Sequence, residues 1–324
     1  MGVNVSVVAV DAGNSKTDIA LIGADGTVLA TARGGGFQPP VVGIDAALDV
    51  LGVILDRALA ACGGSTGSLG HVSACLANAD LPAEEAELTE ALLARGWSRT
   101  VEVRNDTFAL LRAGVDEPRG VAVVCGAGIN CVGMLPDGRT ARFPAIGRIS
   151  GDWGGGSGLA EEALWFAARA EDGRGGATAL ARTLPGHFGL GSVYELIEAL
   201  HRGTIPPAAR HELTPVLFAT SAAGDPVARA LVDRQADEVV AMASVALTRL
   251  DLLDEEVPVL LGGSVLTAGH TQLDERISAL LAARAPKAVI GVVAQPPVLG
   301  AGLLGLDHTG AAPEVHARLR AQYA

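Results

Sequence analysis

The sequence lacks the features that membrane, secreted and nucleic-acid-binding proteins need. No apolar run approaches the roughly 18 residues of a membrane span, and no basic segment followed by an apolar core stands at the N-terminus as in a signal peptide. The net charge of −12 argues against nucleic acid or an anionic membrane as a partner. These absences predict a cytoplasmic protein that acts on a small molecule.

The residues of disulfide, zinc and hydrolase sites are also scarce or scattered. Only four cysteines occur, none in a C-x-x-C pair, so reduced thiols are expected rather than a disulfide or zinc framework. The seven histidines are dispersed without an H-E-x-x-H spacing, and on that ground no protein-ligated transition metal is predicted. The chain also has no G-x-S-x-G nucleophile elbow and no Walker loop.

Lysine is rare too, and one of the two lysines lies in the most informative segment, residues 7–18 (VVAVDAGNSKTD). An apolar strand there ends at Asp11, and a tight turn leads to Lys16 and a second apolar run. Such a hairpin tip offers backbone N–H groups and hydroxyls to an anion, and a carboxylate at Asp11 is placed to hold a hydrated cation. The residues predicted to contact nucleotide phosphates are Gly13, Asn14, Ser15, Lys16 and Thr17.

A variant of this segment recurs at residues 121–143. Ala12-Gly13 matches Ala127-Gly128, and the Asp-Gly turn at 25–26 matches that at 137–138. Two copies of a strand–glycine turn–strand unit indicate two similar halves that face each other, with a phosphate tail between the two glycine turns. Because only the first copy carries a carboxylate at its tip, the duplication favours a nucleotide site over two ordinary hairpins. It adds to the predicted phosphate contacts Gly126, Ala127 and Gly128.

The order of the predicted elements is typical of layered α/β domains, because strands lead and helices are inserted between later strands. The first half predicts strands at 5–11, 17–23, 26–33, 70–77 and 99–104 and helices at 44–61, 82–95 and 106–113. The second half repeats three strands and then predicts a loop at 144–158, helices through much of 158–252, strands at 257–261 and 288–293, and helices at 271–284 and 298–306. A Gly-rich segment at 171–191 is expected to be an exposed excursion. The predicted domains are residues 1–118, to which 305–324 returns, and residues 119–304.

Three further segments carry candidate chemistry. Asp106 follows a strand and opens a helix, so its carboxylate either caps that helix or serves as a general base where ligands collect in open α/β sheets. Asp152 stands in the glycine-dense run 147–158, where a carboxylate can accept from two neighbouring sugar hydroxyls; the alternative is a flexible surface loop. Gly262 and Gly263 follow a strand and would let an adenine or ribose lie against the backbone.

These motifs, in this order, resemble those of the sugar-kinase, Hsp70 and actin superfamily, and most closely the N-acetylglucosamine kinase branch of the BadF/BadG/BcrA/BcrD ATPases. DAGNSKTD (11–18) looks like the first phosphate motif, RNDTFALLRAG (104–114) like the connecting motif, and CGAGIN (125–130) like the second phosphate motif. GRISGDWGGGSGLA (147–160) resembles the sugar-binding motif, and LLGGSV (260–265) resembles the adenosine motif. The resemblance implies an actin-like ATPase fold, in which two ribonuclease-H-like α/β domains flank a central cleft. It also implies ATP and Mg²⁺ as cofactors, an amino sugar as substrate, and a homodimer.

The resemblance assigns roles to individual residues. Asp106 would be the catalytic base, and Asp11 would position Mg²⁺ through water. The sugar would lie against Gln38, Asn105, Asp106, Asn130, Gly151 and Asp152. The adenosine motif would supply Gly262, Gly263, Ser264 and Thr267.

Two departures from the family pattern fall where the substituents of the sugar should lie. The second phosphate motif usually reads G-T-G-S, whereas residues 126–129 read GAGI, so two hydroxyl donors are missing and Asn130 replaces them in part. The early loop usually carries an Asn, whereas residues 36–40 read GFQPP. Together with an acidic pocket, which suits a free ammonium, these changes predict a glucosamine kinase that phosphorylates the 6-hydroxyl. The alternative is an N-acetylglucosamine kinase.

Two other classes are less favoured than a kinase. An ATPase activator of a radical dehydratase would carry an iron–sulfur cluster at a dimer interface, for which Cys125 and Cys131, on either side of the second glycine turn, are poorly placed. A non-catalytic sugar sensor usually has a DNA-binding helix-turn-helix, and no room precedes the first strand for one.

Overall fold

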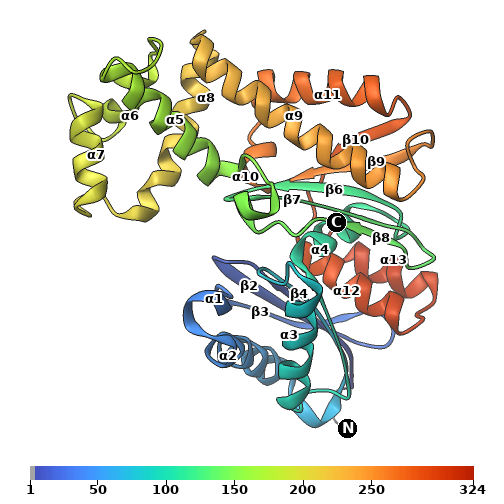
Figure 1. Cartoon of the computed structure of the whole chain (residues 1–324). Coiled ribbons are helices and arrows are strands. Elements are labelled where there is room, and N and C mark those ends of the chain that lie inside the picture. Colours follow the sequence, from blue (N-terminus) through green and yellow to red (C-terminus); the bar gives the residue numbers. More distant parts are fainter. Residues whose placement is uncertain (1–3) are drawn as a thin grey trace. The chain divides into compact units, whose positions relative to one another are not determined.

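The computed structural model describes residues 4–324, and the packing of the chain divides it into two units (Figure 1). Unit 1 comprises the described part of Met1–Ala122 together with Val132–Pro144 and Val292–Ala324, and unit 2 comprises Val123–Cys131 and Ala145–Gly291. Each unit is therefore built from segments that are distant in the sequence. The predicted domain bounds stay a prediction, and residues 1–3 of the first predicted domain lie outside the described residues.

The first sheet has five strands in the order β3-β2-β1-β4-β5. They are β1 (Val5–Ala12), β2 (Lys16–Ile22), β3 (Val28–Gly35), β4 (Leu69–Leu76) and β5 (Thr100–Asn105). The first three are antiparallel neighbours, while β4 pairs with β1, and β5 with β4, in parallel. Valine and alanine fill β1, and residues on both of its faces are buried, as expected for a central strand covered by helices on both sides. The parallel pairing brings the carboxyl ends of β1, β4 and β5 to one edge of the sheet.

Helices cover both faces of this sheet. They are α1 (Pro39–Val42), α2 (Ile44–Cys62), α3 (Pro82–Ala94), α4 (Asp106–Gly114), α12 (Pro297–His308) and α13 (Pro313–Ala321). Leu48, Leu51 and Leu55 recur at helical spacing, so α2 has an apolar stripe, which shares a core with Val8 and Val10 of β1. The alternate residues of β1 face the other way, where α12 packs on β1, β4 and α4.

The second sheet has the order β10-β9-β6-β7-β8, which repeats the strand order of the first sheet. Its strands are β6 (Gly120–Cys125), β7 (Ile129–Met134), β8 (Thr140–Arg142), β9 (Val257–Gly262) and β10 (Ala288–Val292). The strands β6, β7 and β8 hold the places that β1, β2 and β3 hold in the first sheet, as the recurrence of the glycine-turn segment predicts.

The remaining helices belong to unit 2, and two of them depart from the predictions. They are α5 (Gly155–Glu171), α6 (Leu180–His187), α7 (Val193–His201), α8 (Leu213–Ala222), α9 (Pro226–Arg249), α10 (Gly263–Leu266) and α11 (Thr271–Arg284). Most residues of the segment 171–191 are exposed, as predicted, but Leu180 and Leu184 of α6 within it are fully buried against α5 and α8. The helix α5 begins at Gly155, inside the predicted loop 144–158. Among residues 4–324, no helix has the length and apolar character that crossing a membrane requires.

A buried arginine ties α4 to α12 in unit 1. The side chain of Arg112 is only 2% exposed, and its Nε and Nη2 donate to the two carboxylate oxygens of Asp307 at 2.7 and 3.1 Å. Its Nη1 donates to the carbonyl oxygen of Val115 at 2.9 Å. Removing Arg112 would leave the Asp307 carboxylate with His316 alone and the Val115 carbonyl with Arg320 alone.

We therefore expect Arg112→Ala to lower the free energy of unfolding by about 3–5 kcal/mol, as measured by urea denaturation. The exposed ion pair between Arg318 and Asp25 provides the control, since Arg318→Ala removes only a surface contact and should cost far less stability than Arg112→Ala. Equal losses in the two variants would contradict the structural role of Arg112.

Candidate functional site

Three carboxylates gather near the end of β1 in unit 1. Asp11 lies opposite Asp18 of β2 in the sheet register, so their side chains leave the sheet on the same face. Asp106 is the first residue of α4 and directly follows β5, at the edge where the carboxyl ends of the parallel strands meet. The charges of Asp106 and Asp18 both raise the pKa of Asp11, so the three groups are electrostatic neighbours.

Burial sets the protonation of this carboxylate cluster. Burial raises the pKa of Asp11 from 3.8 to about 7, repulsion from Asp106 and Asp18 adds to the shift, and the cations Lys16 and Arg33 oppose it. Burial also raises the pKa of Asp106 to about 6, against the hydrogen bonds at the helix start. A carboxylate with a pKa near 6 is a stronger base than an exposed one and is still ionised at neutral pH. The cluster therefore offers a base beside a carboxyl group that a divalent cation would keep ionised.

The helix cap of α4 is Asn105 rather than Asp106. Asn105 Oδ1 accepts a hydrogen bond from Thr107 N at 2.9 Å, and Asn105 Nδ2 donates to Asp80 Oδ1 at 2.8 Å. Asn105 therefore caps α4, and the Asp106 carboxylate is not required as the helix cap. Because Asn105 is buried and its amide is engaged at both ends, it holds the start of α4 in place, and its contact with a sugar stays a prediction.

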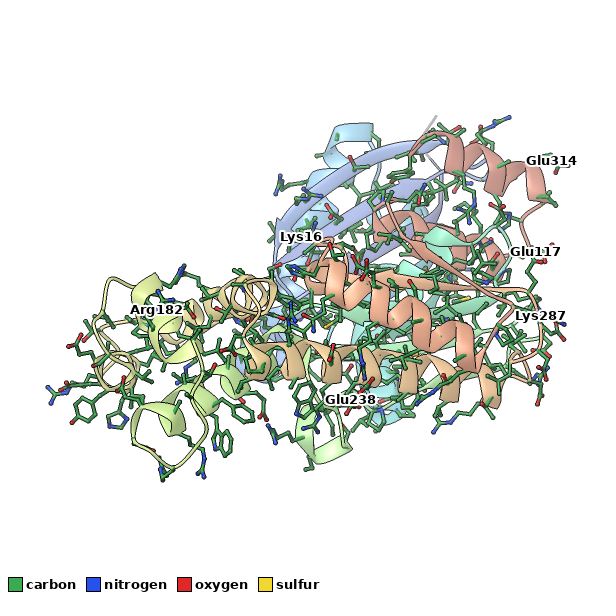
Figure 2. The ribbon with its side chains drawn as sticks, turned by 90° about the horizontal axis from the view of Figure 1, so that it is seen from above. Lys16, Glu117, Arg182, Glu238, Lys287 and Glu314 are labelled. Atoms are coloured by element: carbon green, nitrogen blue, oxygen red, sulfur yellow. The ribbon has the colours of Figure 1, made fainter. Side chains whose placement is uncertain are left out.

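The turn between β1 and β2 is held by the loop that follows β3. Gly13 N donates to Lys16 O at 2.9 Å and so closes the turn, and Phe37 N donates to Gly13 O at 2.9 Å. Gln38 Nε2 donates to Asn14 O at 2.7 Å. Lys16 is exposed at the start of β2 (Figure 2). Gln38, predicted to contact the sugar, is therefore placed against the first phosphate turn.

Asn78 is a residue of this site that sequence reasoning missed. It follows β4 with a φ of 63°, in the left-handed region that Asn tolerates better than most residues. Its Nδ2 donates to Asn14 Oδ1 at 3.0 Å and to Phe37 O at 3.3 Å. The sequence signal that could have identified it is an Asn that directly follows a predicted strand, at the same sheet edge as Asp11.

The side chain of Thr17 does not lie where its predicted role in binding nucleotide phosphates would place it. It pairs with Ala12 in the register, so its side chain leaves the sheet on the face opposite to that of Asp11 and Asp18. It is fully buried, and its Oγ1 has no hydrogen-bond partner among residues 4–324. A phosphate contact of Thr17 would therefore come from its main chain. Ser15, in the turn itself, is exposed.

In unit 2 the second glycine turn lies directly against the start of α5. Gly156 N donates to Gly126 O at 2.7 Å, and Ser157 N donates to Ala127 O at 2.9 Å. Gly155 has a φ of +71°, and a Cβ there would lie 2.6 Å from Ala127 O. Only glycine permits this approach, so the predicted second phosphate turn and the predicted sugar segment form one surface.

The predicted adenosine turn joins the same surface. Gly263, at the start of α10, has a φ of +82°, and a Cβ there would lie 2.5 Å from the backbone of Cys125. Gly262 is buried at the end of β9, whereas Ser264 is exposed. Thr267 Oγ1 donates to Gly263 O at 2.9 Å and so ends the short helix. Three glycine segments that are far apart in the sequence thus meet in unit 2.

Asp152 closes its own loop and faces a cavity. Its Oδ2 accepts from Gly147 N at 3.0 Å and from Ser150 Oγ at 2.5 Å, and Gly151 before it is left-handed with a φ of 88°. The cavity measures about 220 Å³ and is lined by Asp152 together with Gly128 of the second glycine turn. Hydrogen bonds and a 3₁₀ turn hold this segment, which favours the sugar-binding reading over the flexible-loop alternative.

Two polar side chains, Gln235 and Asn130, hydrogen-bond to the backbone next to the glycine turns of unit 2. Gln235, which the sequence analysis did not single out, is completely buried on α9, and its Oε1 accepts from Gly155 N at 3.0 Å. Its Nε2 has no hydrogen-bond partner in the described part of the chain. Asn130 Oδ1 accepts from Cys131 N at 2.7 Å, next to the second glycine turn. The sequence signal for Gln235 was a Gln on the face of a predicted helix that is otherwise apolar and is expected to be buried.

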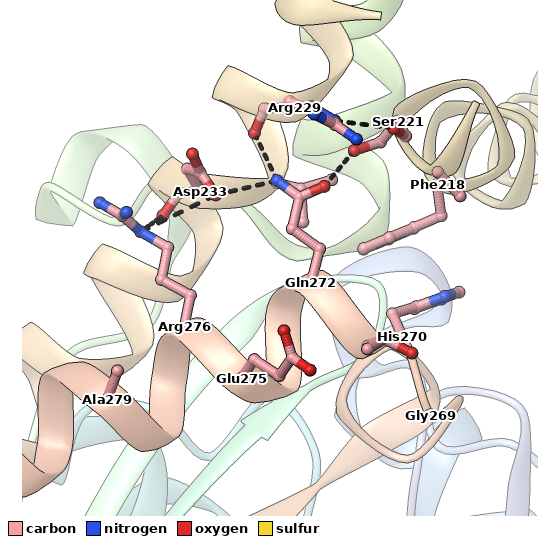
Figure 3. A pocket seen from close by; sticks show the side chains of 13 residues that line it. Phe218, Ser221, Arg229, Asp233, Gly269, His270, Gln272, Glu275, Arg276 and Ala279 are labelled. Carbon is pink, nitrogen blue, oxygen red and sulfur yellow. Dashed lines mark hydrogen bonds and ion pairs between the residues drawn. The ribbon is translucent and has the colours of Figure 1, made fainter. Parts of the chain in front are cut away.

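One cavity of unit 2 adjoins the glycine turns, and a second shares two aromatic residues with it. The first, of about 430 Å³, is lined by Gly126, Ser264, Phe218 and His270. The rings of Phe218 and His270 stack with their centroids 3.7 Å apart, and both rings also line a larger cavity of about 880 Å³ between α8, α9 and α11 (Figure 3). In that cavity Gln272 Nε2 donates to Asp233 Oδ1 at 2.8 Å. Flat rings beside glycine turns suit the planar base of a nucleotide.

The cysteines are poor candidates for a bridging iron–sulfur cluster. All four are free, and Cys125 and Cys131 are fully buried. Burial raises the pKa of the Cys125 thiol to about 12 and raises that of Cys131 well above its usual range. Thiols of this kind are inert structural residues rather than exposed ligands at a subunit interface.

A side chain at Gly263 is expected to disrupt the predicted nucleotide site. Gly263→Ala would place a methyl group 2.5 Å from the Cys125 backbone, so the turns must separate, and we expect the KM for ATP to rise at least about tenfold. Gly224 has a φ of +99° with open space around its Cβ position, so Gly224→Ala has the same backbone strain without the contact. Initial rates at varied ATP would measure both variants, and similar KM values would contradict the role of the turn.

Comparison with known proteins identifies the class to which this fold and site belong. A sequence profile of the BadF/BadG/BcrA/BcrD ATPase family matches residues 8–305, and the chain belongs to this family. It is 26% identical over 272 residues to the N-acetylmuramic acid/N-acetylglucosamine kinase of Clostridium acetobutylicum, covering 83% of this chain and 88% of that one. It is 25% identical over 229 residues to the N-acetyl-D-glucosamine kinase of Dictyostelium discoideum, covering 67% and 71%.

A solved structure supports the fold. A protein from Chromobacterium violaceum, designated an N-acetylglucosamine kinase, superposes with a TM-score of 0.69 at 23% identity, over 93% of this chain and 99% of that one. This similarity and the two five-stranded sheets confirm the predicted fold class, the α/β architecture of the actin-like sugar kinases.

Proposed function

We propose that the protein is an ATP-dependent amino-sugar kinase that transfers phosphate to the 6-hydroxyl of N-acetylglucosamine. The observation that carries this proposal is the Asp106 carboxylate, whose pKa is raised by burial to about 6, beside Asp11 in a member of an ATPase family. The departures from the family motifs at residues 36–40 and 126–129 favour glucosamine as the acceptor. The names of the two curated relatives instead support an N-acetylated acceptor.

In this mechanism Asp106 accepts the proton of the 6-hydroxyl as that oxygen attacks the γ-phosphorus, and ADP leaves. Transfer between oxygens through a loose transition state needs positioning and charge neutralisation more than covalent chemistry. Asp152 accepts hydrogen bonds from hydroxyls of the sugar ring, and its own loop holds the carboxylate in place. The N–H groups of the two glycine turns and the ammonium of Lys16 neutralise the phosphates.

The acidic cluster fits a magnesium ion. Asp11 and Asp106 are partly buried carboxyl groups that repel each other, and Arg33 is already paired with Asp18 at 2.6 Å. A bound Mg²⁺ would neutralise charge that develops on the phosphate oxygens. Asp11 would hold it, because ionised Asp11 then gains a counter-charge that Lys16 alone does not supply.

The test is a coupled ADP-release assay with MgATP and N-acetylglucosamine, N-acetylmuramic acid, glucosamine or glucose as acceptor. Turnover on N-acetylglucosamine at a kcat/KM at least about tenfold above that on glucosamine is expected, with the phosphate on the 6-oxygen by NMR. The reverse preference would favour the glucosamine reading. An absence of turnover on all four sugars by protein that still binds ATP would overturn the kinase assignment.

A further inference from the structure

Two histidines and a glutamate from three separate elements converge in unit 1, on the sheet face that α12 covers. His71 comes from β4, Glu102 from β5, and His308 is the last residue of α12. One ligand atom of each lies within 4.8 Å of those of the other two. His308 Nδ1 is 3.6 Å from Glu102 Oε2, and the two imidazoles stack with their centroids 4.0 Å apart.

The buried member of this group has a ring nitrogen without a partner. His71 is only 2% exposed, and its Nε2 makes no hydrogen bond to any of the described residues. Its Nδ1 lies 3.2 Å from Thr100 Oγ1. When Nδ1–H donates to this hydroxyl, the lone pair of Nε2 is left uncovered in the interior. Histidines that bind metal ions commonly donate their other ring N–H in this way.

The charge state of the group suits a cation. His71 is almost completely buried with an unpartnered Nε2, and a neutral imidazole nitrogen is the donor that binds metal ions. Arg104 pairs with Glu102 Oε1 at 2.7 Å, which leaves the other oxygen, Oε2, directed to His308. The carboxylate is thus both oriented and available.

We propose that unit 1 binds one divalent transition-metal ion of the zinc type through His71, Glu102 and His308. Two imidazoles and one carboxylate form the donor set that Zn²⁺, Co²⁺ and Ni²⁺ prefer over Mg²⁺, which takes oxygen ligands. Metal–ligand bonds of about 2.0–2.2 Å place neighbouring donors roughly 3.4 Å apart in a tetrahedral site. The group therefore has to contract, and His308 can move because its side chain is 45% exposed at a helix end.

An entry path reaches the group from solvent. Glu102 and His308 line a cavity of about 220 Å³ in unit 1, together with Arg104 and Met134. Water in this cavity would supply the remaining coordination position. The expectation from the sequence that no transition metal is bound rested on the absence of closely spaced ligands. It could not detect a site whose three ligands come from residues 71, 102 and 308.

The test uses the full-length protein after chelator treatment, without nucleotide. Titration with Co²⁺ should give the visible absorption of a low-coordinate site at one equivalent per chain, and calorimetry with Zn²⁺ should give a Kd in the micromolar range or below. His308→Ala and Glu102→Gln should each weaken Zn²⁺ binding at least about tenfold. Neither substitution removes the buried His71, and circular dichroism and the Tm of each variant would verify folding.

His201→Ala is the control, because His201 is an exposed histidine at the end of α7 in unit 2. It should leave the stoichiometry and the Kd unchanged. The proposal is overturned if the wild type binds no stoichiometric Zn²⁺ or Co²⁺. It is equally overturned if His308→Ala and Glu102→Gln bind as tightly as the wild type, since the ion would then be held elsewhere. The assay does not depend on kinase activity, so it is independent of the proposed function.

Discussion

Asp106→Asn is expected to lower kcat for sugar phosphorylation by about 10²–10⁴-fold, the range that a positioned general base contributes. Asn keeps the shape of the side chain but cannot accept the hydroxyl proton. Because Asn105 rather than Asp106 caps α4, the substitution should leave the helix intact. The KM for ATP should change less than about threefold. Steady-state kinetics with the best acceptor sugar would measure both values.

Asp45→Asn is the matched control, since Asp45 also lies in the first turn of a helix but is exposed. It should retain wild-type kcat. A further signature comes from pH: the wild-type kcat/KM should rise as pH increases through about 6, where Asp106 loses its proton. The residual activity of Asp106→Asn should lack this rise. If Asp106→Asn kept near-normal turnover, Asp106 would not be the base.

Local patterns predicted much of unit 1. The apolar run before Asp11, the turn at 13–15 and the second run after it specify a hairpin through residues that are adjacent in the sequence. The position of Asp106 between a strand and a helix specifies its place at the sheet edge. These features depend on short-range chemistry, and a single sequence contains all of it.

The support of the site could not be predicted in the same way. Asn78 contacts Asn14 across 64 residues, and Gln235 contacts Gly155 across 80, so the neighbouring sequence could single out each residue but could not identify its partner. The glycine segments of unit 2 could be recognised singly, but their direct contact follows only from the fold. The buried helix α6 was missed because the glycines before it dominate the composition of 171–191.

The orientation of the Thr17 side chain shows a second limit on what the sequence alone can predict. A strand places alternate residues on opposite faces, so the sequence predicts that Thr17 and Asp18 point apart. Which of the two faces carries the reactive groups depends on the register with β1. The structure pairs Asp18 with Asp11 and Thr17 with Ala12, and this pairing decides that the carboxylates share a face.

The carboxylate cluster also predicts a gain in stability when its central member is neutralised. Asp11 has a pKa of about 7 in the folded protein against 3.8 in its ordinary state. Between these values the folded protein holds a proton that the unfolded chain has released, so the free energy of unfolding falls as pH rises from about 4 to about 7. Above pH 7 the whole penalty is present, and it amounts to about 4 kcal/mol.

Asp11→Asn should therefore stabilise the nucleotide-free protein by about 3–4 kcal/mol at pH 8 and by about 1–2 kcal/mol at pH 5. Urea denaturation at the two pH values measures the difference. The same substitution should weaken the dependence of activity on Mg²⁺ and lower kcat, because the ion loses its carboxylate. Asp56→Asn, at an exposed position on α2, should change neither stability nor activity. Equal stabilisation by Asp11→Asn at both pH values would mean that Asp11 is ionised without penalty in the folded protein, and the electrostatic account of the site would be wrong.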